Sequence, residues 1–390
     1  MPGLLPNVDP DGLLEFSVVY TDRSLNHMSE EFKRVMVDIS SVLKDAYNAS
    51  SAVIVPGSGT FGMEAVARQF ANNEKCLVLR NGWFSYRWTQ IFDLANITND
   101  VTVIKGRQLE DSAQGVFAPA PIEEVVAFIK KEKPAVVFAP HVETSAGIIL
   151  PDDYLKAVGE AVRSVNGLFV LDCIASGAMW VDMKACNVDV LITAPQKGWS
   201  SSPCCALIAL GDRARERIDA TQSSSFSMDL KKWLQIMEAY EKGGHVYHTT
   251  MPTDALKILR NVMKETQSLG FAALKDKQIE LGTKVRDLLV SNGYASVAAK
   301  GFQAPGVVVS YTTDPEIQSS KKFLAVGLQT AAGVPLQCDE GPEFKTFRIG
   351  LFGLDKWHDV PATLRHLERA LAEVAAAIVA GITAALAMLV

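Results

Sequence analysis

Two side chains of opposite charge follow two apolar stretches of the chain. Residues 188–192 read as a buried strand, and a turn of small residues leads from it to Lys197. Residues 167–171 form a second apolar stretch, which ends at Asp172, 25 residues before the lysine. That gap fits one strand–crossover–strand unit. We therefore expect both groups at the carboxyl edge of one parallel sheet, where ligands of open α/β sheets bind.

An amine and a carboxylate in this arrangement suit one flat cofactor. A lysine amine at the mouth of a buried sheet can form a Schiff base with an aldehyde, such as that of pyridoxal phosphate. A carboxylate facing the same ligand can keep the pyridine nitrogen of that cofactor protonated. A lysine at a strand end is weak evidence alone, but Lys197 together with Asp172 predicts a site for pyridoxal 5'-phosphate.

A glycine-rich turn follows an earlier strand, at 52–55, and opens a helix. Backbone N–H groups at the 57–60 turn would bind phosphate with the helix dipole behind them, and Ser58 and Thr60 add hydroxyls. The spacing also matches the dinucleotide motif G-x-G-x-x-G. However, the next strand ends at 80–82 without the carboxylate that a ribose requires. A phosphate cradle of another kind is favoured over a nicotinamide or flavin site and over a purely structural turn.

Two further loops follow predicted strands. Residues 81–88 contain four aromatic rings, one of which could stack on a cofactor, although core packing explains most of them. In the loop at 141–147, the hydroxyl of Thr144 could reach an oxygen on the ring of that cofactor. His141 and Glu143 resemble the start of a zinc-deaminase signature, but the Pro-Cys-x-x-Cys segment is absent, so we predict no metal site.

One arginine stands inside an apolar run near the C-terminus. Arg348 lies within residues 347–353, which otherwise read as a strand. A planar guanidinium there suits a bidentate clamp for a substrate carboxylate, and a structural salt bridge is the equal alternative.

The composition excludes several classes of protein. The 390 residues carry a net charge of −6 and contain no basic run, so the sequence predicts no positively charged surface that would attract nucleic acid. The six cysteines are scattered and form no metal or disulfide pattern. The N-terminus lacks the features of a signal peptide, so a cytoplasmic location is expected. The apolar end at 374–390 is short for a membrane span, which favours a helix packed on the body or at a subunit contact.

The elements that position these residues alternate along the chain. Strands are expected near residues 53, 77, 102, 136, 169 and 190 and at 206–210, with helices between them, which is typical of an α/β sheet. From about residue 272 the pattern becomes α+β, with strands near 307 and 347 and a helix from Leu354. We predict an N-terminal arm (1–20), a large cofactor-binding domain (21–268) and a small C-terminal domain (269–390).

Together these motifs resemble the class V aminotransferases of PLP fold type I, and within them the alanine–glyoxylate and serine–glyoxylate (serine–pyruvate) group. The resemblance covers roughly residues 20–370. It rests on these residues: His27 with Phe32, the turn at 57–60 with Glu64, Asn81-Gly82, the loop at 143–147, Asp172, Gln196-Lys197, Tyr247-His248-Thr249-Thr250 with Pro252, and Arg348-Ile349-Gly350 with Gly353.

The resemblance implies a large domain with a mostly parallel seven-stranded sheet. It also implies amino transfer from a small L-amino acid, such as alanine or serine, to glyoxylate or pyruvate. Lys197 would carry the Schiff base and shuttle the proton, and Asp172 would hold the ring nitrogen. Phe84 would stack on the ring, Thr144 would meet its oxygen, and Arg348 would clamp the substrate carboxylate. The implied phosphate ligands are Ser58, Gly59, Thr60 and Gln196, with Tyr247 and Thr250 of the neighbouring subunit of a homodimer.

The sequence differs from the family pattern at three places, and these differences leave the identity of the amino donor undecided. The Gly-Pro-Gly-like segment of relatives is replaced by residues 16–23, where Arg23 could read a second acidic group or form a surface salt bridge. The usual Pro-Pro-Gly after the lysine turn is replaced at 202–204, and the stretch at 337–342 is unusually acidic. A 2-aminoethylphosphonate-type transaminase therefore stays an alternative.

Two other functions share this fold. A cysteine desulfurase would use a loop cysteine before the clamp arginine, and Cys338 has that position. Desulfurases, however, carry histidine before the lysine, where this chain has Gln196. A catalytically silent regulator is the other alternative, and the presence of Lys197, Asp172 and Arg348 together argues against it.

Overall fold

The computed structural model describes residues 24–387, with side chains as far as residue 377. The predicted arm at 1–20 and the segment at 16–23, including Arg23, lie outside the described residues. The main element is a seven-stranded sheet in the order β1-β11-β10-β9-β6-β2-β3. Its strands are β1 (Ser51–Pro56), β2 (Cys76–Arg80), β3 (Val101–Lys105), β6 (Val136–Pro140), β9 (Leu168–Asp172), β10 (Val190–Thr193) and β11 (Cys205–Leu210).

The sheet is parallel except around one strand. β11 runs antiparallel to both β1 and β10, and every other neighbouring pair is parallel. The central strands are buried along their whole length, as expected of strands covered by helices on both faces. The seven strands predicted from the apolar runs are confirmed, and so is the α/β fold with a mostly parallel sheet.

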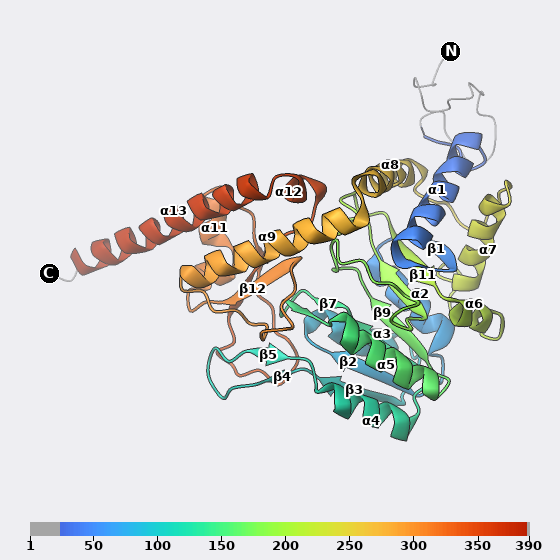
Figure 1. The fold of residues 1–390 in the computed structure, drawn as a ribbon, viewed down its shortest axis with the longest axis horizontal. Coiled ribbons are helices and arrows are strands. Elements are labelled where there is room, and N and C mark those ends of the chain that lie inside the picture. Colours follow the sequence, from blue (N-terminus) through green and yellow to red (C-terminus); the bar gives the residue numbers. More distant parts are fainter. Residues whose placement is uncertain (1–23, 388–390) are drawn as a thin grey trace, which may run out of the picture.

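Helices connect and cover these strands. Figure 1 shows α1 and α7 beside β1 at one end of the sheet and α4 beside β3 at the other. The first helix begins after Ser29, whose hydroxyl caps it by accepting a hydrogen bond from the Phe32 amide (3.1 Å), and it ends at the left-handed Asn48. The helices are α1 (Glu30–Tyr47), α2 (Gly59–Phe70), α3 (Trp83–Leu94), α4 (Ile122–Glu132), α5 (Asp152–Ser164), α6 (Asp212–Asp219), α7 (Leu230–Glu241) and α8 (Thr253–Leu269). Short strands β4 (Arg107–Gln108), β5 (Phe117–Ala118), β7 (Val142–Glu143) and β8 (Ile148–Ile149) lie between them.

The C-terminal part has its own sheet and its own apolar cluster. The sheet has the order β12-β14-β13, and residues of α9, β12, β14 and α13 pack together beside it. The predicted strands near 307 and 347 are therefore confirmed, while the domain limit at 268 stays a prediction. The elements are α9 (Phe271–Ser291), β12 (Val307–Tyr311), α10 (Pro315–Gln318), α11 (Lys321–Ala325), β13 (Ala331–Ala332), β14 (Thr346–Gly350), α12 (Leu354–His358) and α13 (Val360–Ala387).

The chain ends in a long helix. α13 runs alongside α9, and Leu367, Leu371 and Val374 are buried in the C-terminal cluster (Figure 1). Of the apolar end at 374–390, Val374 packs on the body and residues 375–377 are exposed, so the packing of this end stays a prediction. None of the described helices is long and apolar enough to cross a membrane.

One glycine allows α2 to approach the sheet closely. A Cβ atom at Gly62 would lie 2.4 Å from the Cβ of Ala206 on β11 and 3.2 Å from Ile192 on β10. Side chains cannot come that near without displacing the backbone. Gly62 therefore fixes where the first turn of α2 stands relative to the strand ends.

Gly62→Ala is expected to lower the free energy of unfolding by about 1–3 kcal/mol, because the added methyl overpacks the contact with β11. Urea denaturation measures the loss. Gly341→Ala is the control, because no atom lies within 4 Å of the position its methyl would take. Equal stabilities of the Gly62 variant and the parent would show that α2 shifts without cost.

Candidate active site

The parallel pairing of β9 and β10 brings the lysine and the aspartate to one edge. Asp172 ends β9 opposite Ile192 of β10, and Lys197 follows the end of β10 by four residues. Both side chains line one cavity of about 380 Å³. Other predicted site residues on its wall are Ser58, Gly59, Thr60, Phe84, Thr144, Gln196 and Arg348.

The glycine turn forms one end of this cavity. It joins β1 to α2, but β1 is an edge strand that pairs only with β11, and antiparallel. A dinucleotide fold places this turn after a central parallel strand, so the nicotinamide alternative loses its structural context. Ser58 occupies the N-cap position of α2, and its hydroxyl makes no capping hydrogen bond. The hydroxyl and the first N–H groups of α2 are thus available to an anion.

Asp172 is a buried carboxylate with one short backbone contact. Its Oδ1 accepts a hydrogen bond from the Ile174 amide (2.9 Å), and only 7% of the residue is exposed. Burial raises the pKa of Asp172 to about 7, the charge of Glu143 adds to the rise, and Arg87 opposes it. A cationic ring nitrogen beside Asp172 would favour its charged form.

Lys197 has no hydrogen bond or ion pair with any described residue. Its Nζ lies 5.4 Å from the centre of the Phe352 ring. Burial lowers the pKa of the Lys197 amine, and the positive charges of Arg348 and Arg87 lower it further. A lysine with a lowered pKa keeps more of its amine neutral, which is the form that acts as a nucleophile or a base.

Arg348 lies in the middle strand of the small sheet. Its Nε donates to the carbonyl of Ala332 (2.9 Å), and its guanidinium lies 5.6 Å from the centre of the Phe84 ring. Within residues 24–377, no carboxylate lies within ion-pair distance of it. The salt bridge that the sequence left open is therefore not formed there. Burial lowers the pKa of Arg348, as expected of a cation without an anionic partner.

Arg87 is a site residue that the sequence reasoning missed. Its Nη1 donates to Thr60 Oγ1 (3.3 Å), and its guanidinium lies 4.8 Å from the centre of the Phe84 ring. One turn of α3 separates Phe84 from Arg87, so both face the cavity. This spacing in the sequence could have identified Arg87 as a site residue.

Two further lining residues were missed on β14 and beyond it. Arg348, Gly350 and Phe352 alternate along the chain and all line the cavity. Residues two apart on a strand share a face, so the position of Arg348 already indicated the other two.

Glu143 holds the start of α3 in place from outside the cavity. The carboxylate is fully buried and accepts five hydrogen bonds. Oε2 accepts from the Ser85 amide (2.9 Å) and hydroxyl (2.7 Å), and Oε1 from the Phe84 amide (3.2 Å). Oε1 also accepts from the Ser145 amide (3.2 Å) and hydroxyl (2.7 Å). Because α3 carries Phe84 and Arg87, these bonds position two residues of the cavity wall.

Two predicted residues are not brought to the cavity. Tyr247 and Thr250 contact each other through their hydroxyls (3.2 Å), and Tyr247 is 52% exposed. Neither lines the cavity that contains Lys197. Their predicted role belongs to a neighbouring subunit and stays a prediction.

Cys338 also lies away from the lysine. Its thiol is buried, contacts the carbonyl of Arg80 (3.4 Å) and does not line the cavity. Burial holds the pKa of this thiol well above its usual range, at about 12. A desulfurase needs a cysteine that can reach the substrate as a thiolate, so this geometry disfavours that alternative.

The cavity fits pyridoxal phosphate in its donor set and in its shape. Gln196 lines the same cavity as Ser58 and the start of α2, and its buried Oε1 has no partner within the described part of the chain. Oε1 is an acceptor, so the NH2 group of this amide is the part that can donate to a phosphate. A Cβ atom at Gly59 would lie 2.6 Å from the Cδ1 of Ile174, so a larger residue there would have to displace a side chain that lines this cavity. An anion-binding end, a buried carboxylate and a free amine thus share one cavity.

Comparisons with known proteins find similar aminotransferases. The chain is 28% identical over 357 residues to alanine–glyoxylate aminotransferase 1 of Saccharomyces cerevisiae, a match that covers 85% of this chain and 86% of that protein. It is 25% identical over 349 residues to L-aspartate–glyoxylate aminotransferase of Paracoccus denitrificans, covering 85% and 81%. The crystal structure of an alanine–glyoxylate aminotransferase from Nostoc sp. has the same fold, with a TM-score of 0.74 at 22% identity over 89% of each chain.

The family is shown by the sequence itself. The family model described as Aminotransferase class-V matches residues 14–328, which is most of the chain and includes the glycine turn, Asp172 and Lys197. The chain belongs to the class-V aminotransferase family.

Proposed function

We propose that this chain transfers the amino group of a small L-amino acid, such as alanine or serine, to glyoxylate or pyruvate. The observation that carries the proposal is the single cavity lined by Lys197, Asp172 and Arg348 beside the start of α2. An amine, an acid and a carboxylate-binding cation are the three groups that a transaminase of this kind requires.

The family depends on pyridoxal phosphate. When bound, this cofactor supplies an electron sink for the electrons released as the α-hydrogen of the amino acid leaves. Lys197 would hold it at its aldehyde and Asp172 at its ring nitrogen, while Phe84 and Thr144 would contact the ring. The phosphate end would be held by Ser58, Gly59, Thr60 and Gln196.

The side chains divide the work on the substrate. Arg348 binds the α-carboxylate and so orients the α-hydrogen toward Lys197, whose lowered pKa lets its amine take that proton. The same amine would then deliver this proton to the carbon on the other side of the amino nitrogen, a carbon that the cofactor supplies. Phe84 and Phe352 flank these groups and keep water away from them.

The apolar part of the wall supports a small substrate. Met63, Ile174, Val307 and Phe352 line the cavity near the charged groups. A short side chain fits beside them. Among the described residues, Arg87 is the remaining cation of the wall for a second acidic group, and it already contacts Thr60. This supports alanine or serine as the donor.

A homodimer is part of the proposal. Tyr247 is exposed together with Phe226 and Val246, and large apolar side chains exposed near one another suit a contact with a second copy. In that arrangement Tyr247 and Thr250 would reach the phosphate held by the partner. The cytoplasmic location stays an expectation from the sequence.

Lys197→Ala is expected to abolish amino transfer, because no other amine lines the cavity among the described residues. The rate of pyruvate formation from alanine and glyoxylate measures the loss. Lys300→Ala, which removes an exposed lysine, is the control and should match the parent. Turnover by the Lys197 variant would refute the proposal.

Arg348→Met is expected to raise KM for the amino acid about 30-fold, since a lost charged hydrogen bond costs about 2 kcal/mol. The change in kcat should be smaller, because Arg348 binds the carboxylate in the ground state and the transition state alike. Steady-state kinetics with Arg34→Met, an exposed arginine, serve as the control. An unchanged KM would assign the carboxylate to another residue.

Asp172→Asn should alter how the stability of the cofactor-free protein depends on pH. Because the pKa of Asp172 is about 7 when folded and near 4 when unfolded, the folded state binds the proton more tightly. The parent therefore loses stability as pH rises through this interval, by roughly 3 kcal/mol between pH 5 and 8.

Urea unfolding at the two pH values tests this expectation. The Asn variant should lack that loss, whereas Asp153→Asn, which changes an exposed carboxylate, should keep it. Identical pH profiles for the parent and the Asp172 variant would mean that the carboxyl titrates normally.

A further inference from the structure

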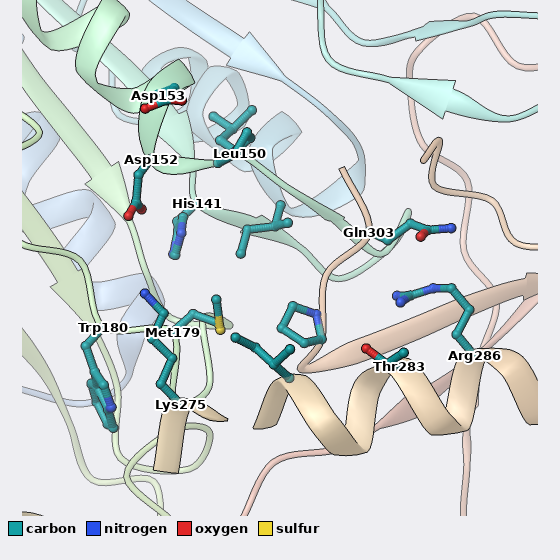
Figure 2. Close-up of a pocket in the computed structure, with 14 residues that line it drawn as sticks. His141, Leu150, Asp152, Asp153, Met179, Trp180, Lys275, Thr283, Arg286 and Gln303 are labelled. Carbon is teal, nitrogen blue, oxygen red and sulfur yellow. The ribbon is translucent and has the colours of Figure 1, made fainter. Parts of the chain in front are cut away.

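A second cavity lies beside the first, and the proposed reaction does not use it. Its volume is about 350 Å³, and its wall is formed by α9, by the segment at the start of α5 and by His141 (Figure 2). Apolar side chains, among them Leu150, Met179 and Ile279, make up part of this wall.

The two cavities are separate but share a wall. His141 lines the second cavity, and the next residue, Val142, lines the first. In the same way Pro305 faces the second cavity and Val307 the first. His141 is fixed in this wall, because its amide donates to the carbonyl of Asp172 (2.8 Å) and its Nδ1 lies 2.7 Å from Ser176 Oγ. A molecule in the second cavity would not enter the first.

α9 presents one face to the second cavity. Lys275, Ile279, Thr283 and Arg286 are spaced by four, four and three residues, which places them along one side of a helix. The two cations of this face have no carboxylate within ion-pair distance in the region that the structure describes. This separates them from the neighbouring Lys284, which pairs with Glu280 at 2.7 Å.

Arg286 is the charge that the fold leaves uncompensated. Its Nη2 donates to the carbonyl of Ala304 (2.8 Å), and its buried Nε has no partner among residues 24–377. Burial lowers the pKa of Arg286 to about 10, and the charge of Asp287, which forms no ion pair with Arg286 and does not line the cavity, opposes this shift. A guanidinium that has lost water on one side without gaining an anion is stabilised by any anion that reaches its open side.

The other charged side chains of the second cavity lie at the end away from Arg286. Figure 2 shows Lys275 extending from α9 toward Asp152 and His141, while Arg286 lies near Thr283 and Gln303. The second acidic residue there, Asp153, pairs with Lys156 at 3.8 Å. The negative charge of the cavity is therefore remote from Arg286.

We propose that this cavity is a binding site for a small carboxylate with a short hydrocarbon chain. The carboxylate contacts the planar guanidinium of Arg286, which matches its geometry, with the Thr283 hydroxyl and the Gln303 amide as neighbouring donors. The hydrocarbon chain lies against Leu150, Met179 and Ile279.

Butyrate tests the proposal, because it carries no amino or oxo group and cannot be turned over. Its dissociation constant is measured by saturation-transfer difference NMR on the pyridoxal-phosphate-loaded protein, in an Arg348→Ala background that removes the carboxylate clamp proposed for the first cavity. Arg286→Met should weaken binding tenfold or more, as expected for a lost charged contact. Lys284→Met removes a charge from the same helix outside the cavity and should leave the dissociation constant unchanged.

One further variant and one competition experiment complete the test. Thr283→Trp fills the exposed rim of the cavity without touching the charge, and it should also abolish butyrate binding even if Arg286→Met folds poorly. Inorganic phosphate should compete only weakly with butyrate. It is tetrahedral and has no apolar chain to contact the apolar wall. The absence of butyrate binding, binding unaffected by Arg286→Met and Thr283→Trp, or tighter binding of phosphate would each overturn the proposal.

Discussion

The parallel pairing of β9 with β10 is the constraint on which the rest of the site depends. It places a carboxylate and an amine at one edge of a sheet, in a cavity that also contains two arginines. Among the described lining residues, two arginines and Lys197, whose pKa is lowered, therefore face one acid, Asp172, and burial suppresses the charge of that acid. Such a cavity is electrostatically unfavourable when empty, and ligands that carry a phosphate or a carboxylate stabilise it.

The surrounding structure keeps these charges where the sheet places them. Glu143 takes five hydrogen bonds from the start of α3 and from Ser145, which fixes Phe84 and Arg87 against the cavity. Gly62 lets α2 stand close to β10 and β11, so the N-terminus of that helix meets the same space. The segments around His141 and Pro305 separate this cavity from the second one, which makes them its shared wall.

The sequence predicted the parts of this structure that depend on local patterns. Apolar runs located all seven strands, and the positions of Asp172 and Lys197 after two of them predicted a shared edge. The role of Glu143 could not be predicted in this way, because its partners on α3 lie nearly 60 residues away and meet it only after folding. Arg286 likewise gave no signal, since only the packing of α9 against the loop at 303–305 leaves its Nε buried and unpartnered. Arg87 and Phe352 were predictable from helix and strand spacing.

Locating the covalent attachment of the cofactor tests whether Lys197 is the residue that binds it. The protein is loaded with pyridoxal phosphate and treated with borohydride, and peptide mass spectrometry then finds the lysine that carries the pyridoxyl group. One modified peptide is expected, with the pyridoxyl group on Lys197. Modification of a different lysine, or of none, would contradict it.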